Sequence, residues 1–333
     1  MEKPGERMAT VAFLLAVLLA GCLEGGGGGH DSGVGSPCDD PLAFADPDLE
    51  RAVLDAIGKD GGPVCPEDVA DLEVLDTNDY KYPIDDISGI ERLSVLVDLD
   101  ISGHLISDLG PLADLTALER LSASNNEISD ISPLSSLTGL VLLDLGVNRE
   151  ISDLEPISGL VQLEELRLFW TKISDLSPLE DLVELRYLNI GLNDVDDIGP
   201  LGDLTALEEL RINQNDVSDL GPVAGLESLR VLSASSNPVS DLGPLEGHPA
   251  LAELGLFGCS VHDIAPLSSV LQLQLLSLGY NEVSDLTPLV ENAGMGEGDT
   301  VYLEANPIDF DDQAENIEAL EARGVNLVFD SSL

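Results

Sequence analysis

Apolar residues recur at a fixed spacing over most of this chain. From Leu96 to Leu289 one pattern, Leu-x-x-Leu-x-Leu-x-x-Asn-x-Ile-Ser-Asp-Leu-x-Pro-Leu, is repeated nine times with a period of 22 residues. One unit, around Arg149-Glu150, has 23 residues. A degenerate first copy begins near Leu72, and a last copy runs from Val301 to Ile308. A constant period of this length predicts a solenoid, in which each unit buries its apolar side only against its neighbours.

The positions within one unit predict a short strand followed by a turn. Apolar residues two apart, such as Leu166 and Leu168, place both side chains on one face of a strand, and that face forms the core. An aspartate follows in ten units and precedes a proline in nine of them. Aspartate as an N-cap and proline in the first turn predict a short 3₁₀ segment on the outer face. The ten residues are Asp86, Asp108, Asp130, Asp153, Asp175, Asp197, Asp219, Asp241, Asp263 and Asp285.

A polar residue occupies the point where each predicted strand ends. A buried amide at this slot can satisfy backbone groups of adjacent coils, which predicts a structural ladder along the solenoid. His104, Thr171 and Cys259 take the same slot in three units. The ladder asparagines are Asn126, Asn148, Asn193, Asn215, Asn237, Asn281 and Asn306.

The segment Ile-Ser-Asp-Leu-x-Pro-Leu resembles the leucine-rich repeats of bacterial internalins and of the Ser-Asp-Ser type phosphatase regulators. The resemblance covers roughly two thirds of the chain. It implies an α/β solenoid, a right-handed leucine-rich-repeat horseshoe with a parallel sheet on the concave face and short 3₁₀ turns on the convex face. It also implies recognition of a protein on the concave face, without naming the ligand.

Residues 1–21 are expected to be a lipoprotein signal peptide. Met8 to Ala20 is an apolar run too short to span a bilayer, and it leads into Leu19-Ala20-Gly21-Cys22. This sequence resembles a bacterial lipoprotein box, which implies lipidation of Cys22, with a palmitate-type modification. The protein would then be anchored in the bacterial envelope, at the outer membrane or cell surface. The alternative is an ordinary secretory signal with a chance cysteine. Residues 22–37, which include five successive glycines, are expected to form a flexible tether.

Both ends of the repeat array show the pattern of a cap. In residues 38–71, Asp46-Pro47-Asp48 predicts the start of a helix that ends at Gly58 and covers the first coil. About ten repeats are expected in residues 72–297. Residues 298–333 hold the last repeat and a second cap, with a helix from Asp311 to Arg323 and a final strand. Caps are required because a solenoid otherwise ends in exposed core and an unpaired sheet edge.

Cys38 and Cys65 flank the first capping helix. In an exported protein a disulfide between them would close a loop and stabilise the fold by roughly 3 kcal/mol through chain entropy. We therefore predict this disulfide. Two free thiols are the alternative.

The chain has 14 basic and 63 acidic residues and a formal net charge of −49. Removal of residues 1–21 leaves this balance unchanged, because they contain two residues of each sign. Nucleic acid is excluded as a partner, since phosphate binding needs a basic surface. The charge is explained by solubility, by attraction to a basic partner or by tolerance of high salt.

Signals for catalysis and metal binding are weak. Ser260, His262 and Asp263 are neighbours on one turn and cannot take up the geometry of a catalytic triad. Cys259 and His262 lack further metal ligands. His248 is expected on an outer turn, like His262. We predict a monomer that is not an enzyme and has no cofactor or metal.

The strand positions that point away from the core are the candidate binding positions. Aromatic residues and arginine, the residue types that dominate protein-binding hot spots, are concentrated at or just after these positions. Aromatic residues also simply suit strands, which is the alternative explanation. The candidates are Arg120, Arg167, Phe169, Trp170, Tyr187, Arg211, Phe257, Tyr280 and Tyr302.

Together these patterns predict a membrane-anchored extracytoplasmic protein that binds a protein or peptide on its concave face. Two other functions remain open. One is a structural envelope protein without a specific ligand, and the other is a glycan-binding surface protein that uses the same aromatic residues.

Overall fold

The structure is a computed structural model that describes residues 38–330, apart from residues 39 and 79–82. The expected signal peptide, Cys22 and the tether lie outside the described residues. Within the described ranges, no helix is both long enough and apolar enough to cross a membrane.

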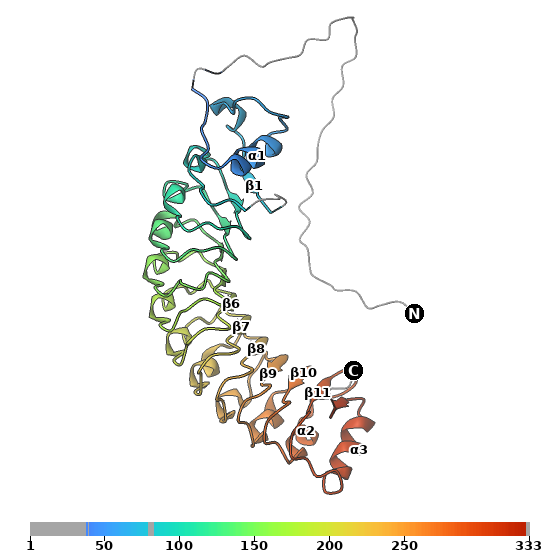
Figure 1. The fold of residues 1–333 in the computed structure, drawn as a ribbon. Helices are drawn as coiled ribbons and strands as arrows, with labels where there is room; N and C mark the ends of the chain where they lie inside the picture. Colours follow the sequence, from blue (N-terminus) through green and yellow to red (C-terminus); the bar gives the residue numbers. More distant parts are fainter. Residues whose placement is uncertain (1–37, 39, 79–82, 331–333) are drawn as a thin grey trace, which may run out of the picture. The chain divides into compact units, whose positions relative to one another are not determined.

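One parallel sheet runs through the repeat array. Its twelve strands follow each other in chain order, and each strand pairs with the next without a register shift. In Figure 1 the strands lie along the inner side of the curved array. The strands are β1 (Val74–Asp76), β2 (Asp98–Asp100), β3 (Arg120–Ser122), β4 (Leu142–Asp144), β5 (Glu165–Arg167), β6 (Tyr187–Asn189), β7 (Glu209–Arg211), β8 (Val231–Ser233), β9 (Glu253–Gly255), β10 (Leu275–Ser277), β11 (Thr300–Tyr302) and β12 (Asn326–Val328). The predicted leucine-rich-repeat horseshoe is confirmed.

Short 3₁₀ helices connect the strands on the outer side of the array (Figure 1). After η1 (Pro66–Asp68) in the N-terminal cap, they are η2 (Ile90–Arg92), η3 (Gly110–Leu112), η4 (Ser132–Ser136), η5 (Glu155–Ile157), η6 (Ser177–Leu179), η7 (Gly199–Leu201), η8 (Gly221–Gly225), η9 (Gly243–Leu245) and η10 (Ala265–Ser269). In the next coil an α-helix, α2 (Thr287–Glu291), takes the place of the 3₁₀ segment.

The prediction that the repeated aspartates are the N-cap residues of the 3₁₀ segments is wrong, because from η3 to η10 each aspartate lies one residue before the cap. In η3 the cap residue is Leu109, and Asp108 precedes it. Oδ1 of Asp108 accepts a hydrogen bond from the backbone N–H of Gly110 at 2.7 Å. The same bond recurs in later coils, for example from Ser177 to Asp175 at 2.9 Å. Each aspartate therefore fixes the turn that leads into the 3₁₀ segment by bonding two residues ahead.

The core is a stack of aliphatic side chains that continues from coil to coil. The central residue of each of the strands β5 to β8, such as Leu188 in β6, is fully buried, and its two neighbours on the strand are only partly covered. Each unit contributes further buried residues from its 3₁₀ segment and the residues that follow, such as Leu201 and Leu204. Because these side chains touch only the coils before and after, the array needs a cap at each end.

The asparagine ladder has the predicted bonding role. Nδ2 of Asn215 donates to the carbonyl oxygens of Ile190 and Ile212, both at 2.9 Å. Oδ1 accepts the backbone N–H of Val195 at 3.0 Å. One amide thus ties its own strand end to the preceding coil. His104 fills the same slot and accepts the N–H of Ile84 through Nδ1.

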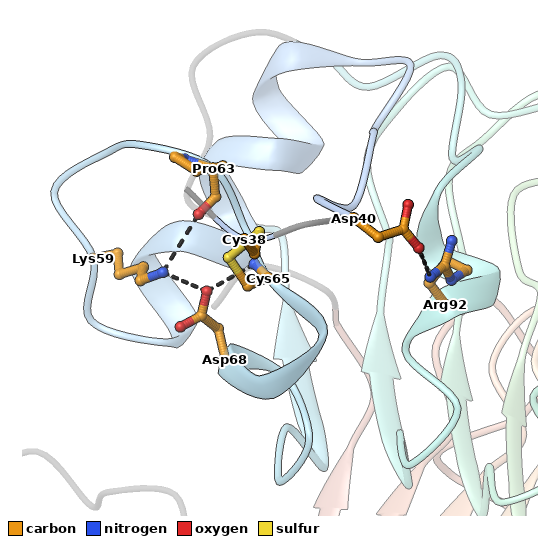
Figure 2. The surroundings of a disulfide bond; sticks show 7 residues. All are labelled: Cys38, Asp40, Lys59, Pro63, Cys65, Asp68 and Arg92. Atoms are coloured by element: carbon orange, nitrogen blue, oxygen red, sulfur yellow. Dashed lines mark hydrogen bonds and ion pairs between the residues drawn. A yellow bond between two sulfur atoms is a disulfide. The ribbon is translucent and has the colours of Figure 1, made fainter. Parts of the chain in front are cut away.

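The N-terminal cap confirms the predicted helix and disulfide. Helix α1 (Pro47–Ala56) begins after Asp46, whose carboxylate accepts the N–H groups of Asp48 and Leu49. Cys38 and Cys65 form a disulfide with Cα atoms 5.8 Å apart. Figure 2 shows this bond beside η1, where Asp68 accepts the N–H of Cys65 at 2.7 Å and also contacts Lys59. An ion pair between Asp40 and Arg92 (3.4 Å, Figure 2) connects the start of the cap to η2.

We expect replacement of both cysteines, Cys38→Ser with Cys65→Ser, to lower the free energy of unfolding by about 3 kcal/mol, because the open chain regains loop entropy. Unfolding should begin in the N-terminal coils, since each coil depends on its neighbours. Hydrogen exchange during urea denaturation measures this order. Cys259→Ser, which removes the free thiol of the repeat array, is the matched control. Equal stability of the double variant and the control would contradict the structural role of the bond.

The C-terminal cap has the predicted elements with a shorter helix. Helix α3 spans Ala314–Ala322, not the whole of 311–323, because Asp309 accepts the N–H groups of Asp311 and Asp312 in a turn that precedes it. Gly324 then has a left-handed φ of 85°, which ends the helix and sends the chain into β12. The cap is joined to α2 by Arg323, whose guanidinium donates to the carbonyl oxygen of Val290 at 2.8 Å.

Candidate binding surface on the concave sheet

Parallel pairing in register aligns the concave side chains in columns across the sheet. The residues on either side of each strand centre point away from the core. One column therefore contains Glu165, Tyr187 and Glu209 on adjacent strands. A second contains Arg167, Asn189 and Arg211. The predicted candidates that lie on strands thus share one surface, although they come from separate repeats.

Four candidates lie together at β5 and β6, and we call them the Trp170 group: Arg167, Phe169, Trp170 and Tyr187. The rings of Phe169 and Trp170 meet edge to face with centroids 6.5 Å apart. The guanidinium of Arg167 lies 5.5 Å from the ring centroid of Tyr187. Trp170 is 39% exposed, which is a large exposed apolar area for one side chain.

The structure adds Arg149 to this group. Its guanidinium lies 3.6 Å from the ring centroid of Trp170, within the range of a cation–π contact. Arg149 belongs to the longer unit, and only its position in the neighbouring coil brings it to the indole. The extra residue in that unit was the one sequence signal that could have drawn attention to it.

Trp170 and Tyr280 lie on the turn that leaves the strand, not on the strand itself. Their φ angles are 56° and 58°, in the left-handed region. The residue before the ladder slot has this conformation in successive coils, for example Gln214 before Asn215. The backbone of the ladder turn therefore sets the orientation of both aromatic side chains at the edge of the concave sheet.

Three further candidates lie at β9 to β11, and we call them the Tyr280 group: Phe257, Tyr280 and Tyr302. The rings of Phe257 and Tyr280 are 4.9 Å apart and tilted by 50°. Both are exposed, as is Leu275 in β10. Leu275 aligns with Glu253 at an outward strand position, and sequence reasoning missed it because only aromatic residues and arginine were considered there.

Each arginine of the described concave sheet has an acidic partner, which the sequence did not reveal. Arg120 lies 3.3 Å from Asp98 on the neighbouring strand. Arg167 lies 3.5 Å from Asp144 and also contacts Glu165, and Arg211 contacts Glu209. Arg120 stands apart, two strands before the Trp170 group, and Arg211 lies between the two aromatic groups. The arginines therefore hold acidic side chains of the strands in place and offset part of the negative charge of this surface.

A shallow hollow of about 180 Å³ lies on the concave sheet across β7 to β10. Its floor consists of small residues in one column, Ser233, Gly255 and Ser277, and Arg211 lies at one end. Val231, Glu253 and Leu275 form one side. Small side chains at successive strands leave space for a ligand backbone to approach the sheet.

The convex side is acidic and closely hydrogen-bonded. The pKa values of Asp130 and Asp175 are lowered, because the backbone N–H and the hydroxyl of the serine two residues later donate to each carboxylate. A carboxyl group with a lowered pKa stabilises the folded state above its unfolded pKa of about 3.9. This contribution is lost as pH falls through that value toward the folded pKa.

We expect Ser132→Ala to raise the pKa of Asp130 toward the ordinary value and to leave that of Asp175 unchanged, since the lost hydroxyl serves only its own coil. Ser177→Ala should have the reciprocal effect. Carbon-detected NMR titration of the carboxyl groups between pH 2 and 6 checks both. If neither serine variant raises the pKa of the aspartate in its own turn, the serine hydroxyls do not contribute to the lowered pKa values.

The buried His248 and the largely buried Cys259 belong to the scaffold. His248 lies on the outer side just after η9, as expected, but its side chain is buried, with Nε2 at 3.0 Å from the carbonyl oxygen of Leu226. Burial lowers the pKa of His248 and raises that of Cys259. In the part of the chain that the structure describes, no group of three or more His, Cys, Asp or Glu side chains is placed to hold a metal ion.

The in-register parallel strands and the asparagine ladder define a leucine-rich-repeat protein. Residues 116–159 match the family model described as leucine rich repeats (2 copies). The internalin inlF of Listeria monocytogenes is 28% identical with a TM-score of 0.78, and the alignment covers 86% of this chain and 90% of that one. Internalin C2 of the same organism is 33% identical with a TM-score of 0.62 over 65% of this chain and 97% of its own. The chain therefore belongs to the internalin-like family of bacterial leucine-rich-repeat proteins.

A more distant match concerns the fold alone. A plant peptide hormone receptor, RGFR1 in complex with RGF2, is 16% identical with a TM-score of 0.55 over 68% of this chain and 42% of that one. None of the curated protein sequences matches the chain. Solenoids of this family are typically binding scaffolds without catalytic activity, and the disulfide is typical of an extracellular or surface protein.

Proposed function

We propose that this protein is a membrane-anchored extracytoplasmic binding protein that recognises a protein or peptide on its concave face. The observation that carries the proposal is the concentration of exposed aromatic side chains at two places on that one face. Exposed aromatic side chains next to arginine are the usual centres of binding energy in protein interfaces.

The spacing of the two groups supports a macromolecular ligand. Five strand spacings separate β5 from β10, which corresponds to a distance on the order of 25 Å. The hollow at β7 to β10 lies within this span. A ligand that contacts both groups must be an extended peptide or a protein surface. The plant receptor in complex with RGF2 has the same fold, which supports ligand binding by a solenoid of this kind.

The test is capture of a partner from envelope and medium extracts by the immobilised protein, followed by quantitative mass spectrometry. Trp170→Ala, handled in parallel, identifies the proteins whose capture depends on the concave face. We expect at least one protein to be enriched by the natural chain and reduced with the variant. Equal enrichment by the natural chain and by Trp170→Ala would show that the partner binds outside the Trp170 group. No enriched protein in either extract would favour a structural role in the envelope.

The anchor is a separate part of the proposal, based on the sequence Leu19-Ala20-Gly21-Cys22. We expect Cys22→Ser to move the protein from the detergent phase to the aqueous phase of fractionated cells, because the cysteine sulfur carries the lipid. Cys259→Ser is the control for loss of a thiol. Continued partition of Cys22→Ser into detergent would show that a lipid on this residue is not the anchor.

A further inference from the structure

We propose that Phe257, Tyr280 and Glu304 form a slot for a basic side chain, lysine or arginine, of the protein partner. We call these three residues the cation slot. The inference rests on the proposed function, because it specifies the chemistry of the ligand at one end of the concave face.

The first observation is a carboxylate without a partner. Oε2 of Glu304 is buried and has no hydrogen-bond partner among the described residues. No described basic side chain forms an ion pair with this carboxylate either. An unpaired carboxylate oxygen shielded from water raises the free energy of the protein, and a cation bound beside it would recover that energy.

The second observation is the position of this carboxylate beside an aromatic ring. A Cβ atom built on Gly279 would lie 2.9 Å from Oε2 of Glu304 and 3.1 Å from Cδ2 of Phe257. The carboxylate of Glu304 and the ring of Phe257 therefore both lie against the backbone of Gly279, where a larger residue would not fit. Tyr280 follows directly, and its ring is 4.9 Å from that of Phe257.

Rings and carboxylate together suit a long basic side chain. The methylene groups of lysine or arginine can pack on the exposed rings, which are 42% and 55% accessible for Phe257 and Tyr280. The ring faces attract the charged end, and the carboxylate of Glu304 forms the ion pair. A sugar could stack on the rings, but as a neutral molecule it would leave the carboxylate charge without a counterion.

Asp100 and Glu253 of the concave strands form no ion pair with a described basic side chain, but other acidic side chains of the sheet do. Arginines contact four of them: Asp98, Asp144, Glu165 and Glu209. Glu304 has no contact with an arginine or lysine of this chain among the described residues. Its counterion would therefore be supplied by a basic side chain of the bound protein. The net charge of −49 adds a long-range attraction for a basic partner, which raises its rate of association.

The probe is a short fluorescein-labelled peptide of alternating lysine and glycine, compared with the same peptide carrying Nε-acetyl-lysine. Binding to the full-length protein is followed by fluorescence anisotropy at an ionic strength of about 0.15 M, where long-range attraction is screened. We expect the lysine peptide to bind about tenfold more tightly than the acetylated one. Glu304→Gln and Tyr280→Ala should each weaken its binding about tenfold, which corresponds to about 1.4 kcal/mol.

Two control variants separate the slot from general charge and general aromatic effects. Glu246→Gln makes the same change of charge on the convex side after η9, and Phe310→Ala removes an exposed ring that packs on Phe329 outside both aromatic groups. Both should bind like the natural chain. Thermal unfolding confirms that each variant is folded. Equal binding of the two peptides, unchanged binding by Glu304→Gln, or equal weakening by Glu246→Gln would each overturn the cation slot.

The outcome is separable from that of the proposed function. A captured partner that depends on Trp170 but binds Glu304→Gln normally would refute the slot and leave the concave face as the binding surface. Selective binding of the lysine peptide without any captured partner would support the slot and refute the proposed recognition of a protein from those extracts.

Discussion

The double variant Arg167→Ala, Trp170→Ala is expected to weaken binding of the captured partner by about 4 kcal/mol, roughly a thousandfold in Kd. Trp170 alone should contribute about 2 kcal/mol, as a hot-spot residue does. Arg167 should contribute a similar binding free energy, because its guanidinium lies beside the ring of Tyr187 and can contact the partner there. Isothermal titration calorimetry with the purified partner measures the change.

Folding stability of this double variant should remain nearly unchanged. Trp170 is largely a surface residue, and alanine in the left-handed turn has a Cβ atom just as tryptophan does. The ion pairs of Arg167 are partly exposed, and such pairs contribute about 0–1 kcal/mol. Arg186→Ala, directly before β6 and outside the Trp170 group, serves as control and should bind normally. A double variant with an unaltered Kd would exclude the Trp170 group from the interface.

Asn215→Leu is expected to lower the free energy of unfolding by about 4 kcal/mol. The substitution leaves the N–H of Val195 without its partner. It also removes one of two hydrogen bonds from the carbonyl oxygens of Ile190 and Ile212, which keep their bonds from Asn193 and Asn237. A buried polar group left without any bond costs about 1–3 kcal/mol, and each of the two further lost hydrogen bonds costs about 0.5–1.5 kcal/mol. Urea denaturation followed by circular dichroism measures the change.

Asn213→Leu is the matched control in the same coil, because Asn213 lies outside the ladder and its side chain is only partly covered. It should change stability by about 0.5 kcal/mol or less. Similar destabilisation by the two variants would show that leucine is tolerated poorly throughout this turn, and the ladder would lose its claimed role.

The fold was predictable because every unit obeys one pattern. A residue such as Leu188 is buried for the same reason in each coil, and the slot of Asn215 repeats with the same bonds. Errors arose where local geometry depends on one residue. The turn aspartates lie one position before the cap, and burial of the His248 side chain on its outer turn was not foreseen.

The candidate surface was predictable only in part. Periodicity places Arg167 and Tyr187 on the concave side, since the side chains of a strand alternate. It says nothing about pairing across strands, so the contact of Arg167 with Asp144 was not foreseen. The unpaired carboxylate of Glu304 was equally invisible, because its isolation depends on the positions of Phe257 and Gly279 in other coils.

The central claim is that recognition takes place on the concave face, and one substitution on each face tests it directly. Ser233→Trp places a bulky side chain on the floor of the hollow, whereas Ser135→Trp places the same side chain on the exposed outer segment η4. Partner capture is repeated with both folded variants and the natural chain. The account predicts that Ser233→Trp loses the partner and Ser135→Trp retains it. Loss of the partner by Ser135→Trp alone, or its retention by Ser233→Trp, would contradict the claim.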